Sequence, residues 1–279
     1  MIEFGASVKA WYVINIKARQ EQTSAHYVNA FKKLWEKDPL ISINKSGRSM
    51  SLKFLELSKT GNVVSLVEIG LLAYTIIDKD GFYNIKKHEK VPMDNWNKDV
   101  VANISETELL FFPSFHKVVV KKSTAVSLNR ILQYLQEALD IIEPEVFDVS
   151  VVTDRDAIER IIKAKSIYSI EAKVSYSNPG NTSGFRKLFE DKVKGTKPQK
   201  MSISLVGSVD NPLVSEDDGL IQCIADMAEQ DGTINAVIQE GNKRVTIDSK
   251  EHPKIIHMKS RGRDWLNKLW TKMNESYGK

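Results

Sequence analysis

Residues 50–85 read MSLKFLELSKTGNVVSLVEIGLLAYTIIDKDGFYNI, and this stretch decides the fold class. Its apolar runs are rich in the β-branched and aromatic residues typical of strands. Gly61-Asn62 and Asp80-Gly81 are turn signals between those runs. The pattern therefore predicts an antiparallel meander, with strands over residues 50–57, 63–68, 71–78 and 81–85.

Outward from the meander, helices and strands alternate along the chain. Val28, Phe31, Leu34 and Trp35 recur at helical spacing within residues 21–37, and a second helix is predicted over residues 128–142. Further strands are expected over residues 8–17, 108–121, 145–153, 166–176, 201–206, 233–238 and 244–247, and further helices over 154–165, 184–193, 216–229 and 262–275. The sequence predicts an α+β fold of mixed or antiparallel sheets with flanking helices. We expect two lobes, residues 1–143 and 144–279.

Composition excludes several classes of protein. The chain has 279 residues, with five Trp and ten Phe, which excludes intrinsic disorder as its main state. A single cysteine, Cys223, excludes an intramolecular disulfide framework and any Cys-rich metal site. No apolar run approaches the roughly 20 residues that cross a bilayer, and the first residues do not resemble a secretory signal. We expect a cytoplasmic protein without a metal or cofactor.

Charge is unevenly distributed in the C-terminal half. Residues 155–200 hold eleven Lys or Arg and five Asp or Glu, a net charge of +6. Residues 201–235 hold seven acids and no Lys or Arg, and residues 236–279 hold ten basic and five acidic residues, a net charge of +5. If the two basic blocks meet in the fold, they form a positive face that attracts a polyanion.

Such a face would bind phosphates through flexible cationic side chains, which need no particular order in the sequence. No helix-turn-helix, zinc-finger or RNP-type signature indicates reading of a base sequence. The expected DNA contacts are Arg186, Lys187, Lys192, Lys194, Lys197, Lys243, Arg244, Arg261 and Arg263.

One constellation favours an enzyme instead. Asp148 or Asp154, followed by Glu171 and Lys173, is the pattern of Mg²⁺-dependent PD-(D/E)xK-like nucleases. In such enzymes two carboxylates hold the metal and the lysine supports the attacking water. Strand alternation places Glu171 and Lys173 on one face, where they would otherwise form an ordinary ion pair. No phosphate-binding glycine loop, nucleophile elbow or HExxH motif occurs in the chain.

Two segments resemble a known family. ELLFFPSF and TDRDAIERIIKAKSIYSIEAKV are similar to segments of the RexA-like exclusion proteins of lambda-like phages, in the same order and at similar spacing. The matching residues are Phe112, Pro113, Ser114, Phe115, Asp156, Glu171, Ala172 and Lys173. The aromatic residues of FFPSF are also expected in the core, with Pro113 at a strand end or bulge.

The resemblance implies a cytoplasmic, homodimeric protein that binds double-stranded DNA and blocks infection by other phages. It also implies that the protein senses phage DNA and acts with a small RexB-like membrane partner. A third hypothesis is a protein-interaction module, in which Trp265 and Trp270 of the last helix dock a partner or a second subunit. We expect these two tryptophans to close the core instead.

Overall fold

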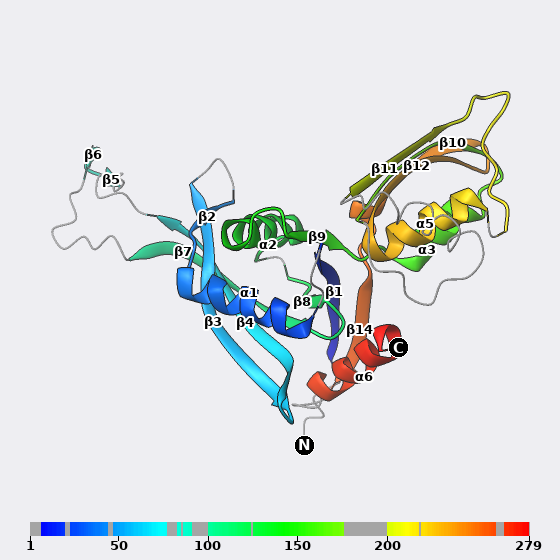
Figure 1. The fold of residues 1–279 in the computed structure, drawn as a ribbon. Helices are drawn as coiled ribbons and strands as arrows, with labels where there is room; N and C mark the ends of the chain where they lie inside the picture. The colour runs from blue at the N-terminus through cyan, green and yellow to red at the C-terminus, as the bar shows by residue number, and fades with distance from the viewer. Residues whose placement is uncertain are drawn as a thin grey trace, which may run out of the picture.

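The computed structural model describes residues 7–19, 23–43, 47–76, 83–84, 86–90, 100–123, 125–175, 200–217, 219–260 and 265–278. Helices flank two principal sheets, in which every strand pairing is antiparallel (Figure 1). The prediction of an α+β fold with flanking helices is confirmed.

The larger sheet has eight strands. Its order is β14-β1-β8-β7-β4-β3-β2, and β9 pairs with β1 beside this path. The strands are β1 (Ser7–Ala18), β2 (Ile41–Ser42), β3 (Arg48–Thr60), β4 (Val63–Ile76), β7 (Val101–Phe112), β8 (Lys117–Lys121), β9 (Phe147–Val151) and β14 (Ile255–Ser260). A separate short ladder joins β5 (Tyr83–Asn84) to β6 (Glu89–Lys90).

Helices cover both faces of the large sheet. On one face, α1 (Ser24–Lys37) and α2 (Leu128–Ile142) enclose a core that includes Ile14, Ile16 and Phe31. Each fully buried side chain of this size contributes about 1.5–3 kcal/mol to folding. On the opposite face, α6 (Trp265–Tyr277) packs against the residues of β1 with the other parity, Trp11 and Val13.

The tryptophans of α6 belong to this second core. The Trp265 ring stacks on Trp11 with their centroids 5.2 Å apart, and the Trp270 ring lies 5.3 Å from that of Phe112. The expectation that both tryptophans close the core is confirmed, which removes the sequence feature that favoured a docking role for this helix.

The smaller sheet has the order β11-β10-β12-β13. Its strands are β10 (Ile167–Ser175), β11 (Lys200–Val206), β12 (Gly232–Glu240) and β13 (Lys243–Asp248). Two helices, α3 (Arg155–Ile162) and α5 (Leu220–Asp231), lie on one face. They bury the alternate residues Ile170, Ala172, Ile234 and Ala236.

The small sheet extends from one edge of β1. Residues 14–18 of β1 pair with β9 and residues 7–12 pair with β14, so these two strands lie end to end along β1. Between them, Val13 accepts a hydrogen bond from Val152 N–H and donates one to Lys254 O, at 2.9 and 3.1 Å. The chain leaves the large sheet after Val152 and returns to it at Lys254, so the small sheet is an insertion.

Several predicted boundaries differ from the structure. The predicted strands 63–68 and 71–78 are one strand, β4, which continues through Gly70. The Phe54 ring occupies the space that a side chain at residue 70 would need, so the glycine is explained by this close packing and not by a turn. Conversely, the predicted strand 108–121 is two strands joined by a tight turn at residues 113–116, with Pro113 just past the end of β7. β7 also begins at Val101, seven residues before the predicted start of this strand at residue 108, and β14 was not predicted.

The later helices differ as well. α5 begins at Leu220, four residues after the predicted start, so Glu216 and Asp217 precede the helix. The predicted helix over residues 184–193 lies outside the described residues. The division at residue 143 stays a prediction, but sheet membership does not follow it, because β9 and β14 belong to the large sheet.

Candidate nucleic-acid interface

The face of the small sheet opposite α3 and α5 is open. No described element packs on it, and its side chains are those of the alternate residues that the helices leave uncovered. Register places them in cross-strand rows: Ser202, Lys173 and Thr233 in one row, and Ser204, Glu171, Asn235 and Asp248 in the next. Most of these side chains are polar and short, so the face offers hydrogen-bonding groups close to the backbone.

An ordered arginine lies at one end of this face. The Arg244 guanidinium stacks on the Tyr168 ring, with the guanidinium carbon 4.2 Å from the ring centroid. The Tyr168 hydroxyl donates a 2.8 Å hydrogen bond to Gln239 Oε1 on β12. Gln239 is the cross-strand partner of Arg244, so the three side chains form one unit across three strands. Stacking orders an otherwise flexible cation while leaving its N–H donors available.

The charges on the open face have both signs. Lys173 and Glu171 form an exposed ion pair with Nζ and Oε1 3.5 Å apart, so the positive charge of Lys173 is largely compensated. Arg244 and its exposed neighbour Lys243 have no ion pair with any described residue. The uncompensated positive charge therefore lies at the β12–β13 end of the face.

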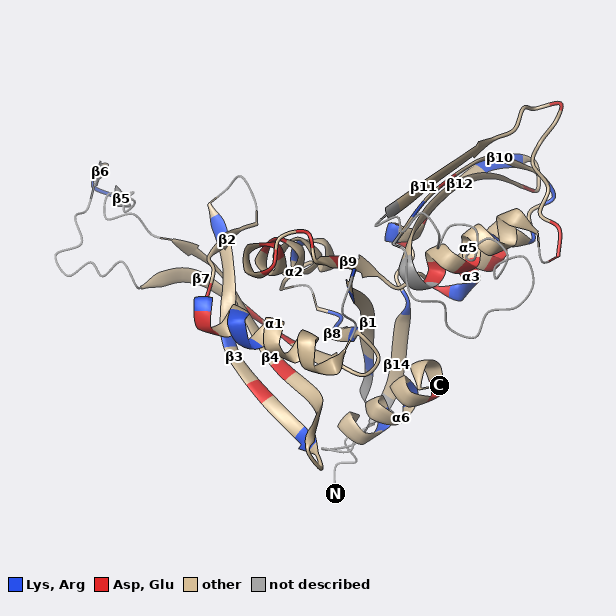
Figure 2. Cartoon of the chain, in the orientation of Figure 1, with Lys and Arg blue, Asp and Glu red and all other residues tan. Residues whose placement is uncertain are grey.

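Two acids of the run at residues 201–235 form ion pairs with α3. The Arg155 guanidinium binds Asp226 and Glu229 of α5 at 2.7 and 2.6 Å, and Figure 2 shows these basic and acidic segments side by side. Hydrogen bonds to Glu229 and Asp226 raise the pKa of Arg155, against the opposing effect of burial. On the same helix, Arg160 binds Glu240 at 2.8 Å. Part of the first basic block is thus neutralised within the protein.

Two of the nine expected DNA contacts are described. Lys243 and Arg244 are exposed at the start of β13, beside the Gly241-Asn242 turn. The other seven, Arg186, Lys187, Lys192, Lys194, Lys197, Arg261 and Arg263, lie outside the described residues. The meeting of the two basic blocks therefore stays a prediction.

The structure does not bring the candidate nuclease residues together. Asp148, on β9 of the large sheet, accepts hydrogen bonds from Arg19 Nε and Nη2 at 3.1 and 3.0 Å. Asp154 is the N-cap of α3 and accepts a 2.9 Å hydrogen bond from the N–H of Asp156. Glu171 and Lys173 share the open face of β10, as alternation predicted. Within the described ranges, no three His, Cys, Asp or Glu side chains form a group that could hold a metal ion.

Sequence reasoning missed Tyr168. Strict alternation from Ile170 would point Tyr168 toward the helices, but the register of β10 on β12 shifts between Ile167 and Ser169. Such a bulge adds one residue and reverses the side-chain phase beyond it. No local pattern in the sequence predicts this bulge. Only the presence of Tyr168, Gln239 and Arg244 on neighbouring strands could have indicated that the Tyr168 side chain lies on the open face.

One family model covers most of the chain. The model of the family described as a domain of unknown function (DUF4747) matches residues 9–269. The chain belongs to the DUF4747 family. The match runs from β1 into α6, so both sheets of the chain lie within the DUF4747 domain. No curated protein matches this DUF4747 chain. Of its described helices, none has the length and apolar character needed to cross a bilayer.

Proposed function

We propose that this DUF4747 protein binds double-stranded DNA without sequence preference, as a cytoplasmic component of a phage-exclusion system. The observation that carries the proposal is the stacking of Arg244 on Tyr168, at the uncompensated end of an open sheet face. An arginine held in this way loses little conformational entropy when it binds a phosphate.

The surroundings of Arg244 support a phosphate-binding role. Lys243 adds a second exposed cation, and Thr246 of β13 is an exposed hydroxyl on the same face as Arg244. Hydroxyl, amide and cationic side chains make most protein–DNA contacts to phosphate oxygens, and such contacts carry no base specificity. The proposed interface therefore distinguishes polyanions by charge and shape.

The RexA-like resemblance supports the biological setting. We propose that the protein acts as a homodimer, which doubles the number of phosphate contacts, and that it signals to a small RexB-like membrane protein. The basic residues outside the described ranges would extend the interface beyond Arg244. If about six phosphates are contacted, affinity falls about 10³-fold between 50 and 200 mM salt.

The test is a fluorescence-anisotropy titration of labelled 30-base-pair duplexes of unrelated sequence with the full chain, repeated across that salt range. The double variant Lys243→Glu/Arg244→Glu should weaken binding to every duplex alike and reduce the salt dependence. The double variant Lys32→Glu/Lys59→Glu reverses the same number of exposed charges on α1 and β3, so it is the matched control and should have a much smaller effect. A double variant as tight as the wild type would show that the open face does not bind DNA.

A second pair of variants isolates the stacking. Tyr168→Phe keeps the ring under Arg244 and should retain most of the affinity. Tyr168→Ala removes the ring without changing the net charge and should weaken binding several-fold.

Incubating plasmid DNA with the protein and Mg²⁺ or Mn²⁺ tests the nuclease alternative, which would be established by cutting that Lys173→Ala abolishes.

A further inference from the structure

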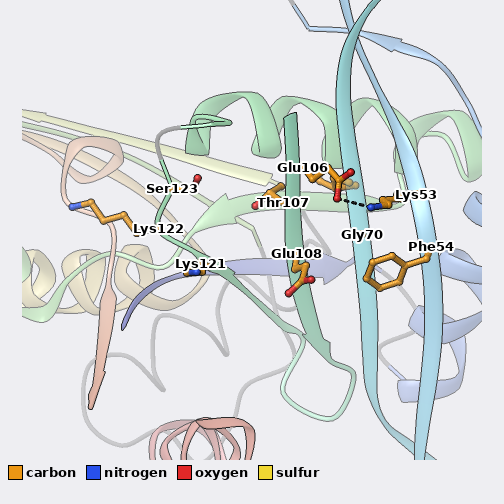
Figure 3. A pocket seen from close by; sticks show the side chains of 10 residues that line it. Lys53, Phe54, Gly70, Glu106, Thr107, Glu108, Lys121, Lys122 and Ser123 are labelled. Carbon is orange, nitrogen blue, oxygen red and sulfur yellow. Dashed lines mark hydrogen bonds and ion pairs between the residues drawn. The ribbon is translucent and has the colours of Figure 1, made fainter. Parts of the chain in front are cut away.

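A cavity of about 560 Å³ opens in the large sheet where β7 and β8 separate (Figure 3). Glu106, Thr107 and Glu108 of β7 line one wall, and residues 121–123 line the other. The cavity is in a different sheet from Tyr168 and Arg244, so it is independent of the proposed DNA interface.

The separation of the strands explains the cavity. β7 pairs with β8 only through residues 109–112, whereas β4 follows the other edge of β7 as far as Val101. Beyond Val120 the chain stays with β1: Lys121 pairs with Trp11, and Lys122 N–H donates a 2.8 Å hydrogen bond to Ala10 O. Residues 101–108 of β7 therefore have β4 on one edge and, among the described strands, no partner on the other.

An unpaired strand edge presents backbone N–H and C=O groups that can form a ladder with another chain. Extended peptides bind sheets in this way, with backbone hydrogen bonds giving affinity and side-chain pockets giving specificity. We propose that the cavity binds an extended peptide segment as an additional strand on β7, with a Lys or Arg side chain opposite Glu108.

The β7 side of the cavity favours a cation. Glu108 is exposed, and none of the described residues forms an ion pair with it. Glu68 lies on the adjacent strand; burial raises its pKa most, and the negative charges of Glu56 and Glu108 raise it further. Glu106 differs, because Lys53 Nζ lies 2.5 Å from it and neutralises it.

The other walls of the cavity carry an aromatic ring, that of Phe54, and a positive charge, that of Lys121. The Phe54 ring lies over Gly70, where an added Cβ would come within 2.4 Å of it, so this side of the cavity is an aromatic surface. It can pack against the aliphatic part of a lysine side chain. Lys121 on the facing wall repels a basic peptide, so Glu108 and Lys121 should have opposite effects on its affinity.

The test uses the full chain and the labelled peptide acetyl-Thr-Val-Thr-Lys-Thr-Val-Thr-amide, with binding followed by fluorescence anisotropy. Glu108→Lys should weaken binding at least tenfold, and Lys121→Glu should strengthen it several-fold. Glu36→Lys on α1 is the matched control and should leave the affinity unchanged. A peptide with Glu in place of Lys should bind the wild type more weakly and prefer the Glu108→Lys variant.

Backbone pairing is tested separately from charge. Two further peptides carry N-methyl groups on either the odd or the even residues, and one of the two should lose binding because its ladder hydrogen bonds are blocked. Bound peptide should slow amide hydrogen exchange within residues 101–108. No binding of the parent peptide, equal binding of both methylated peptides, or unchanged exchange over this segment would each overturn the proposal, whatever the outcome of the DNA titration.

Discussion

Thr153 and Pro253 lie opposite each other in an antiparallel bridge between the two connections that join the sheets. Hydrogen bonds flank the bridge on both sides, from Asp154 N–H to His252 O at 2.9 Å and from Lys254 N–H to Val152 O at 2.7 Å. The connection is thus a short strand pair, and it restrains the small sheet more than two independent loops would.

The first prediction concerns the Thr153 side chain. Thr153 is fully buried, and its Oγ1 has no hydrogen-bond partner among the described residues. A buried hydroxyl without a partner costs about 1–3 kcal/mol of desolvation, which an apolar group of the same shape avoids. Thr153→Val should therefore leave the free energy of unfolding unchanged or raise it by about 1 kcal/mol, measured by urea denaturation.

Thr153→Ala is the matched control, because it removes a methyl group together with the hydroxyl. It should be less stable than Thr153→Val by about 2 kcal/mol, because alanine lacks both methyl groups of valine at this buried site. A loss of stability in the valine variant as large as that in the alanine variant would mean that the hydroxyl is bonded in solution.

The second prediction separates structure from catalysis at Asp148. Both oxygens of this carboxylate bind Arg19, and the hydrogen bond to Asp148 raises the pKa of Arg19 more than burial lowers it. Asp148→Ala leaves the guanidinium without this partner and should lower the free energy of unfolding by about 3 kcal/mol.

Glu171→Ala removes an exposed carboxylate and should change stability by less than about 0.5 kcal/mol. Chemical denaturation of the two variants side by side provides the comparison. An Asp148→Ala protein of wild-type stability would contradict a structural role and return Asp148 to the list of candidate catalytic residues.

The third prediction concerns pH and the contact between α1 and α2. Glu143, at the end of α2, binds His26 and Lys33 of α1 at 2.7 and 2.8 Å. Burial alone would raise the pKa of Glu143, but the hydrogen bonds from His26 and Lys33 outweigh it and lower the pKa below 4.5. A carboxylate whose pKa is lower in the folded protein stabilises the fold above its unfolded-state pKa.

This contribution should be present at neutral pH and disappear as the pH falls through the folded-state pKa of Glu143. Glu143→Gln should therefore cost about 1 kcal/mol at pH 7, and the difference from the wild type should shrink as the pH falls below the unfolded-state pKa of 4.5. Urea denaturation at several pH values measures it. A difference between the two proteins that does not change with pH would show that these ion pairs contribute nothing.

Local sequence signals located most elements. Pro39 and Pro144 lie just past the ends of α1 and α2, and β-branched runs indicate β1, β4 and β10, because proline ring geometry and strand pleat act over a few residues. The N-cap of α1 is Thr23, two residues after the predicted helix start at residue 21. Pairing between distant segments had no such signal. β9 and β14 contact β1 across more than 120 residues, so their place in the large sheet could not be read from residues 144–260 alone.

The candidate site shows the same limit. The exposed pair of Lys243 and Arg244 could be predicted from charge, since cations at a hairpin turn remain in solvent. The partnership of Arg244 with Tyr168 could not, because it depends on a bulge and on β10 and β13 each pairing with β12. Likewise, the cavity beside Glu108 exists because the end of β8 stays paired with β1 and not with β7. This pairing depends on residues far apart in the sequence, so no local pattern predicts it.

The pairing of β1 also has a consequence for synthesis of the protein. β1 is the first described strand to leave the ribosome, yet its partners are residues 117–121, 147–151 and 255–260. One edge of β1 stays partly unpaired until residues 255–260 have been synthesised. Exposed strand edges are prone to aggregate. We therefore expect the nascent chain to depend on chaperones until β14 emerges.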